Sequence, residues 1–173
     1  NVYLKTENFF EAIENFDKVI SIRKDYSPAY QGKAIAFKKL LKFNDAIEAW
    51  QKVCEINPGD THSLVQKGDL LFDLNRLDEA LKAYNTAFSI DPNKSFLLGN
   101  IVHTKTKMCE WSEIDKDKSN LKKKILDNER GTSPYVSLTI FDDPEIHLKA
   151  ANIWSEEHYN KKDKKNYKEF DVT

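Results

Sequence analysis

The sequence predicts an all-α fold built from helix-turn-helix units that repeat along the chain. A first observation is an alanine that recurs at one constant interval, at Ala12, Ala46 and Ala80. A second is an aromatic side chain four residues after each alanine, at Phe16, Trp50 and Tyr84. A third is the scarcity of Gly and Pro, five of each in 173 residues, which favours helices joined by short turns. A repeat period of this length is typical of stacked helical pairs.

The repeat over residues 27–60 contains two helical patterns separated by a turn. The first pattern places apolar side chains three and four positions apart, at Tyr30, Ala34, Phe37 and Leu41. The second pattern begins near Asp45, because a carboxylate suits the positive end of a helix. We expect Trp50 to fill the space toward the next repeat. The unit ends at Pro58, which cannot continue a helix.

Residues 61–94 follow the same plan, with Gly68 as the predicted point of close contact between the two helices. The copy over residues 1–26 is truncated, because Asn1 falls inside what should be its first helix. We therefore expect a segment of a longer array, whose first repeat leaves Tyr3 and Phe9 on an open face. Such a face would allow end-to-end association into a homo-oligomer.

The period and pattern of these copies resemble the tetratricopeptide repeat (TPR). The resemblance implies a superhelix of helical pairs, whose first helices line a concave groove that binds peptide or protein partners. The residues of these helices that the core does not use form the predicted peptide-binding groove: Gln31, Ile35, Lys38, Lys39, His62, Val65, Asp69, Phe72 and Asp73. Apolar side chains beside lysines and opposing aspartates suit an extended or helical peptide. The same residues are also compatible with an ordinary solvated helix face.

The repeat pattern weakens over residues 95–130, where we expect a degenerate repeat or capping helices. The positions at which an alanine and an aromatic residue are due hold Ile114 and Lys118. Ser112, with Asp115 three residues later, predicts the start of a helix by a weak form of the capping box.

Residues 131–160 are expected to contain an extended segment followed by a helix. The run at 133–141 is largely apolar, and we expect it to be extended. Asp143 then predicts an N-cap, with Pro144 as the first residue of the following helix. Residues 161–173 are predicted to form a polar linker or tail.

Motifs in this second half resemble those of one family. The motifs are Lys107-Met108-Cys109, Glu110-Trp111-Ser112, and the Asp142-Asp143-Pro144 helix with Ala150-Ala151 and Trp154. They resemble the junction between TPR superhelix and catalytic domain in bacterial O-linked N-acetylglucosamine transferases and SPINDLY-type proteins, although the first motif is one residue shorter. The resemblance implies a substrate-recruiting, non-catalytic segment of a nucleotide-sugar-dependent protein glycosyltransferase. A free-standing TPR adaptor that assembles a complex is the alternative.

Catalytic and cofactor-binding residues are not expected in this chain, because those of the resembled family lie beyond the junction. Members of that family also line the groove with asparagines, whereas the helices at 27–41 and 61–74 contain none, which disfavours backbone clamping. The four histidines form no metal-ligand pattern: His62, His103, His147 and His158. We therefore predict no enzyme activity, no cofactor and no metal for this chain.

Composition restricts the classes of partner. A formal net charge of −1 argues against a dedicated nucleic-acid binder. No apolar run approaches the roughly 18 residues needed to cross a bilayer, and no signal-peptide pattern opens the chain. Cys54 and Cys109 lie far apart, which argues against a disulfide framework, and we expect Cys109 to be buried. These features predict a cytoplasmic protein that binds proteins or peptides, without nucleic-acid or membrane partners. High Lys, Asn, Ile and Asp content suggests a bacterial source.

Overall fold

The computed structural model describes residues 2–158, except for the side chains of residues 2–7 and of residue 157. This part of the chain forms nine α-helices and no strand, which confirms the predicted all-α class. The chain divides into two compact units, Asn1–Pro92 and Asn93–Thr173, and each is described by itself. The predicted tail at 161–173 lies outside the described residues.

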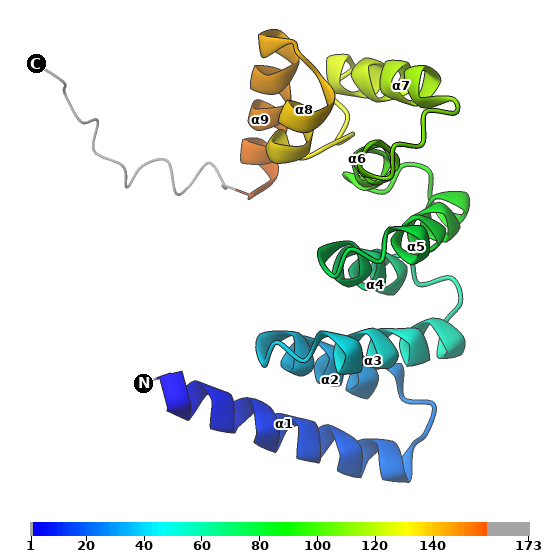
Figure 1. The fold of residues 1–173 in the computed structure, drawn as a ribbon. Helices are drawn as coiled ribbons and strands as arrows, with labels where there is room; N and C mark the ends of the chain where they lie inside the picture. Colours follow the sequence, from blue (N-terminus) through cyan, green and yellow to red (C-terminus); the bar gives the residue numbers. More distant parts are fainter. Residues whose placement is uncertain (1, 159–173) are drawn as a thin grey trace, which may run out of the picture. The chain divides into compact units, whose positions relative to one another are not determined.

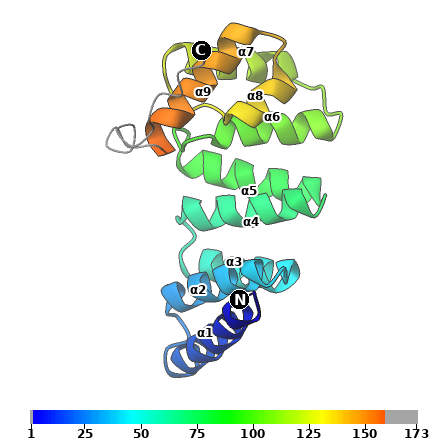
Figure 2. The same ribbon diagram turned by 90° about the vertical axis from the view of Figure 1, so that its left-hand side faces the viewer.

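The first unit consists of helices that pack in chain order. They are α1 (Val2–Ile22), α2 (Ser27–Lys39), α3 (Phe43–Ile56), α4 (Thr61–Asp73) and α5 (Leu77–Ile90). Helices α2 and α3 form one pair and α4 and α5 form the next, with α3 packed on α4 between them (Figures 1 and 2). Because each turn reverses the chain, α2 and α4 run in the same direction and belong to equivalent positions of successive pairs.

Close contacts inside and between these pairs agree with the sequence analysis. A Cβ atom on Gly68 would lie 2.5 Å from Cε1 of Tyr84, so only glycine permits this approach of α4 to α5. Trp50 is 2% exposed, and its ring meets the His62 ring of the next pair edge-on, with centroids 5.9 Å apart. The predicted roles of Gly68 and Trp50 are thus confirmed.

The turns within the two pairs share one backbone geometry. Leu41 and Asn75, which occupy equivalent positions of successive repeats, both have a φ of 59°. The N–H of Leu41 donates to the carbonyl of Lys38 (3.1 Å), and the N–H of Lys42 donates to that of Phe37 (2.9 Å). The second turn repeats this pattern around Asn75. The pattern is a left-handed helix C-cap, which satisfies carbonyls that the helix end would leave unpaired.

The first repeat, predicted over residues 1–26, differs from the expectation of a helical pair. Its described part before the turn forms one continuous helix, α1. No Gly or Pro interrupts residues 2–22, so nothing in the backbone forces a break there. The side chain of Tyr3 lies outside the described residues, whereas Phe9 is half-buried.

The second unit also contains only helices within its described residues. They are α6 (Leu97–Lys107), α7 (Ile114–Leu126), α8 (Pro134–Ile140) and α9 (Pro144–His158). The turn after α6 keeps the repeat geometry, because Cys109 lies one repeat period after Asn75 and has a φ of 56°. The degenerate repeat therefore retains a backbone feature that its side chains no longer reveal.

Two predicted helix starts had different outcomes. The start near Ser112 is wrong: α7 begins at Ile114, and the Ser112 hydroxyl donates to Glu110 at 3.1 Å instead of capping a helix. The start at Asp143 is confirmed, because its Oδ1 accepts from the N–H of Glu145 (3.2 Å) and of Ile146 (3.4 Å).

The extended segment predicted at 133–141 is wrong, because most of it forms α8. Ser133 caps this helix by accepting a hydrogen bond from the N–H of Val136 at 3.4 Å, and Pro134 occupies its first turn. Val136 and Ile140, four residues apart, are both buried. Burial of this helical stripe outweighs the preference of β-branched residues for an extended backbone.

The segment before α8 packs on the start of α6. The N–H groups of Phe96 and Gly99 donate to the carbonyls of Arg130 (2.6 Å) and Gly131 (2.9 Å). A Cβ atom on Gly99 would lie 2.9 Å from the Cα atom of Thr132, so glycine allows this close approach. Carbonyl oxygens of the loop thus satisfy donors at the start of α6.

Candidate functional site

The nine predicted groove residues all lie on α2 and α4. Their spacing places them on one side of each helix, and we call this surface the α2/α4 face. Four of them are exposed: Ile35, Lys39, His62 and Asp73. The others are partly buried: Gln31, Lys38, Val65, Asp69 and Phe72. The face therefore combines solvent-exposed charges with partly covered apolar side chains.

A hydrogen bond joins the two helices at their N-terminal ends. The Nε2 of Gln31 donates to Oδ2 of Asp60 at 3.2 Å. Asp60 is the N-cap of α4, and its Oδ1 accepts from the N–H groups of His62 (3.0 Å) and Ser63 (3.2 Å). Partial burial opposes ionisation of Asp60, but these bonds and one from the Ser63 hydroxyl outweigh it and hold its pKa below the ordinary value. Gln31 therefore has a structural role.

Asp69 also has a structural partner. One of its carboxylate oxygens accepts a hydrogen bond of 2.7 Å from the hydroxyl of Tyr84 on α5. Burial raises the pKa of Asp69, and the neighbouring Asp73 adds to this effect, whereas Tyr84 and Lys38 oppose it. Burial, together with Asp69, also raises the pKa of Tyr84. In the sequence, Tyr84 stands out only as the aromatic residue of the repeat, and the repeat pattern does not reveal this contact.

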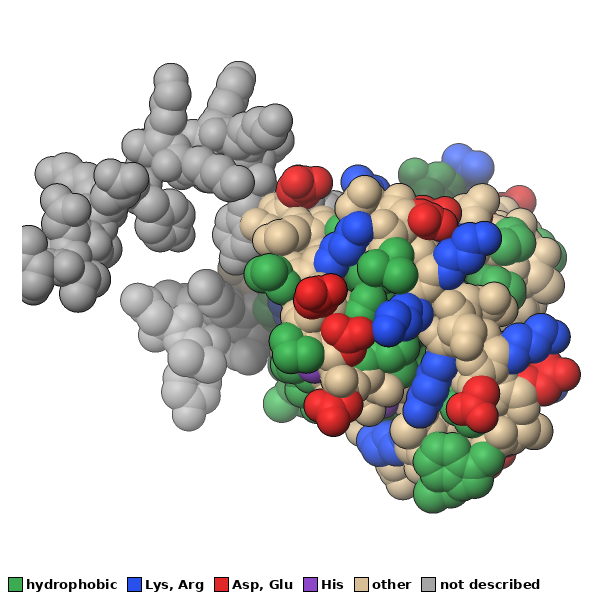
Figure 3. Space-filling view, turned by 90° about the horizontal axis from the view of Figure 1, so that it is seen from above, with side chains coloured by type: hydrophobic (Ala, Val, Ile, Leu, Met, Phe, Trp, Pro, Cys, Tyr) green, Lys and Arg blue, Asp and Glu red, His purple; other side chains and the backbone are tan. Residues whose placement is uncertain are grey.

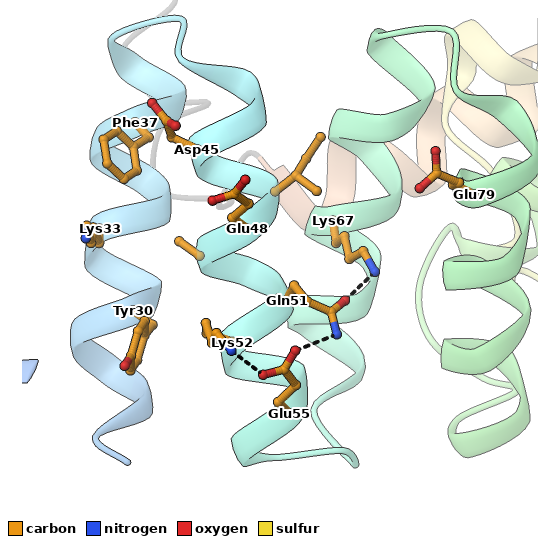
Figure 4. A pocket seen from close by; sticks show the side chains of 12 residues that line it. Tyr30, Lys33, Phe37, Asp45, Glu48, Gln51, Lys52, Glu55, Lys67 and Glu79 are labelled. Carbon is orange, nitrogen blue, oxygen red and sulfur yellow. Dashed lines mark hydrogen bonds and ion pairs between the residues drawn. The ribbon is translucent and has the colours of Figure 1, made fainter. Parts of the chain in front are cut away.

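A cavity of about 650 Å³ lies elsewhere on the first unit and includes none of the nine residues. From α2 it is lined by Tyr30, Lys33 and Phe37 (Figure 4), whose positions along the helix place them on a different side from the α2/α4 face. Tyr30 and Phe37 were predicted as core residues, but both are half-buried, and Leu41 of the same stripe is 72% exposed. The apolar stripe of α2 is therefore only partly used by the core.

Four polar side chains of this cavity form hydrogen bonds with one another. Glu55 accepts from Lys52 (2.7 Å) and Gln51 (3.1 Å), and Lys67 donates to Gln51 at 2.6 Å (Figure 4). Hydrogen bonds from Lys52 and Gln51 lower the pKa of Glu55. These contacts join α3 to α4 and give Lys52, Glu55 and Lys67 partners within the protein.

The second unit offers no clustered site among its described residues. His147 Nε2 lies 2.9 Å from the carbonyl oxygen of Phe141, and His158 stacks on Trp154 with ring centroids 3.8 Å apart. Cys109 is exposed, so the expectation of its burial is wrong: it lies in the left-handed turn after α6. Acidic and basic side chains are interspersed with hydrophobic ones on the surface shown in Figure 3.

The described residues give no indication of a metal site or of a membrane span. None of their His, Cys, Asp and Glu side chains gather in a group of three or more that could hold a metal ion. None of the described helices is both long and apolar enough to cross a membrane.

The first unit matches a known repeat family. Residues 61–94, which form α4, α5 and their turns, match the family model of the tetratricopeptide repeat. Small glutamine-rich tetratricopeptide repeat-containing protein 2 of Mycosarcoma maydis is 23% identical over 112 residues, which are 65% of this chain and 32% of that protein. Hsp70-Hsp90 organizing protein 2 of Arabidopsis thaliana is 23% identical over 101 residues, which are 58% of this chain and 18% of that protein. The chain thus spans about a third or less of these relatives.

Solved structures share the fold. A crystal structure of MamA protein is 21% identical, with a TM-score of 0.58 over 66% of this chain and 63% of that chain. The first TPR of Spaghetti (RPAP3), solved with the HSP90 peptide SRMEEVD, is 23% identical, with a TM-score of 0.54 over 63% of this chain and 86% of that chain. Residues 61–94 thus contain a tetratricopeptide repeat, within a fold of helical pairs that these solved structures share.

Proposed function

We propose that this chain is a protein-interaction scaffold, and that its α2/α4 face binds a peptide segment of a partner protein. The observation that carries the proposal is Ile35, an aliphatic side chain that is 50% exposed one turn before the lysines at the end of α2. An exposed apolar residue beside charges is a common composition for peptide recognition. The peptide seen with the first TPR of Spaghetti supports the proposal, because that structure shares this fold.

The architecture of the face suits such a role. Tyr84 and Asp60 hold residues of α4 and α2 by hydrogen bonds, so the face is built on helices that are fixed before a partner arrives. The ring of Trp50 also contacts the ring of the exposed His62 edge-on. Rigid elements reduce the ordering cost of binding, because the surface does not have to be assembled around the peptide.

Peptide selection tests the proposal directly. The whole 173-residue chain is immobilised, and a random peptide library displayed on phage is enriched against it. Selected peptides are then synthesised, and their dissociation constants are measured by fluorescence anisotropy. We expect the double variant Lys39→Glu, Phe72→Ala to lose binding at least about tenfold, because it removes a charge and an apolar contact.

Lys82→Glu is the matched control, because Lys82 is exposed on α5 outside the face. Circular dichroism and thermal unfolding establish that each variant remains folded. The proposal fails if no peptide is enriched, or if the folded double variant binds as tightly as the wild type.

Two settings for the whole protein remain as proposals. The motifs at 107–113 and 142–154 support a recruiting segment of an O-linked glycosyltransferase, a setting that rests on sequence resemblance alone. The matched curated relatives are TPR-containing and chaperone-organising proteins by name, which supports the adaptor setting. The complete coding sequence separates the two, since a nucleotide-sugar-binding domain after this segment is required by the first setting and not by the second.

A further inference from the structure

The charges of the α2/α4 face differ in how far the protein itself satisfies them. Asp69 accepts the hydrogen bond from Tyr84, and Lys38 is close enough to favour its ionised form. Lys38 and Asp69 therefore offset one another, and both are partly buried. By contrast, Lys39 and Asp73 are exposed, and neither forms an ion pair with a described residue.

Lys39 and Asp73 occupy equivalent places in successive pairs. They are one repeat period apart, and each is the last residue of its helix. The helices α2 and α4 run in the same direction and are joined at their N-terminal ends through Gln31 and Asp60. Lys39 and Asp73 therefore lie at equivalent positions along their helices. A peptide that crosses both helices would therefore pass both charges.

Ile35 adds an apolar contact to this arrangement. It precedes Lys39 by four positions, so it lies on the same side of α2, one turn nearer the start of the helix. A peptide that crosses near the last turns can therefore cover Ile35 while its charged side chains reach Lys39 and Asp73.

We infer that the segment recognised by the α2/α4 face carries one acidic and one basic side chain, with an apolar residue close to the acidic one. The acidic side chain pairs with Lys39, the basic side chain pairs with Asp73, and the apolar residue covers Ile35. This inference rests on the proposed function, and it adds the chemistry of the partner. Opposite charges on adjacent helices also select the direction in which the peptide crosses the face, because the reversed order places like charges together.

Charge reversal in the same library selection tests the inference. We expect the wild type to enrich peptides that contain both charges in one order. Lys39→Glu should enrich peptides in which the acidic residue is lost or replaced by a basic one, and Asp73→Lys should do the opposite. The double variant Lys39→Glu, Asp73→Lys should again enrich peptides with both charges, but in the reverse order.

Affinities provide a second readout. Each single charge reversal should lower the affinity for a peptide selected on the wild-type protein about fivefold to tenfold, because an attraction becomes a repulsion at an exposed site. The double variant should bind a synthetic peptide with reversed charges, and its dissociation constant should lie within about threefold of that of the wild-type protein with the original peptide. Lys82→Glu on α5 should leave both the selection and the affinity unchanged.

The outcomes separate this inference from the proposed function. If peptides are enriched and require Phe72 but show no charge order, the face binds peptides and the inference on charge is overturned. If charges are selected but the double reversal keeps the original order, other residues read them and the inference is again overturned. If no peptide is enriched, the proposed function fails first.

Discussion

The hydroxyl group of Tyr84 on α5 donates a hydrogen bond of 2.7 Å to a carboxylate oxygen of Asp69 on α4. Tyr84 is also the aromatic residue that packs on Gly68, one position before Asp69. A single core side chain thus sets the distance between two helices with its ring and orients a residue of the candidate binding face with its hydroxyl.

Replacing Tyr84 by phenylalanine removes the hydroxyl and retains the ring. We expect Tyr84→Phe to lower the free energy of unfolding by roughly 1–3 kcal/mol, because a partly buried carboxylate loses a donor. Urea denaturation followed by circular dichroism measures this change. Tyr30→Phe is the matched control, since the Tyr30 hydroxyl donates to the carbonyl of Lys24 at an exposed site. An equal effect of both substitutions would contradict the role assigned to Tyr84.

Asp69 predicts a dependence of stability on pH. Burial raises its pKa above the ordinary value of 3.8, so the folded state holds this proton more tightly than the unfolded state. Its contribution to the free energy of unfolding is therefore greatest below 3.8 and decreases as the pH rises through the raised pKa. Asp69→Asn removes this decrease, so the stability of the variant relative to the wild type should increase with pH over that window. Urea titrations at several pH values check the sign, and a relative stability that falls with pH would contradict the assignment.

Gly68 should not tolerate even the smallest side chain. A Cβ atom there would lie 2.5 Å from the Tyr84 ring, so we expect Gly68→Ala to destabilise the protein by about 1–3 kcal/mol. This loss opposes the gain of about 1 kcal/mol that alanine brings within a helix. Gly59→Ala is the control, because a Cβ atom at this position would have no neighbouring atom within 4 Å. Thermal unfolding compares the two variants, and a stabilised Gly68→Ala would refute the close contact.

Leu41 is strained by its backbone conformation. Its φ of 59° is left-handed, which costs a residue with a Cβ atom about 1–2 kcal/mol. Its side chain is 72% exposed, so little burial is lost on truncation. We expect Leu41→Gly to raise the free energy of unfolding by roughly 0.5–1 kcal/mol, after the greater flexibility of glycine in the unfolded chain is subtracted. Asn75→Gly at the equivalent turn should raise the free energy of unfolding by less, because asparagine tolerates this conformation. Chemical denaturation of both variants provides the comparison.

The long-range packing of the second unit explains why its secondary structure was harder to predict. The residues of α8 include the β-branched Val136, Thr139 and Ile140 and carry no long periodic pattern, so the sequence favoured an extended segment. This seven-residue helix has only two buried apolar residues, Val136 and Ile140, and its stability comes from packing that short sequence patterns do not reveal. The Ser133-Pro134 step was the one local signal for a helix start.

The sequence predicted which residues share one side of α2 and α4, but not which of them form hydrogen bonds within the protein. The helical spacing in residues 27–41 and 61–74 identified the α2/α4 face, since side chains three and four positions apart share one side of a helix. The same spacing could not show that Gln31 bonds to Asp60 or that Asp69 bonds to Tyr84, because these partners come from other elements. Gln31 and Asp69, which were predicted as binding residues, therefore also connect helices of the fold.

The sequence by itself determined the period, the helical pairs and the tight contact at Gly68, because each depends on residue type at short spacing along the chain. Only the tertiary structure decided which charges of the α2/α4 face are satisfied, that α1 continues without a break and that α8 is helical. The physical reason is that burial and hydrogen-bond partners are properties of neighbours in space. The close contact at Gly68 and the left-handed turns are set within one repeat, whereas the helix at α8 depends on how separate elements of the second unit pack.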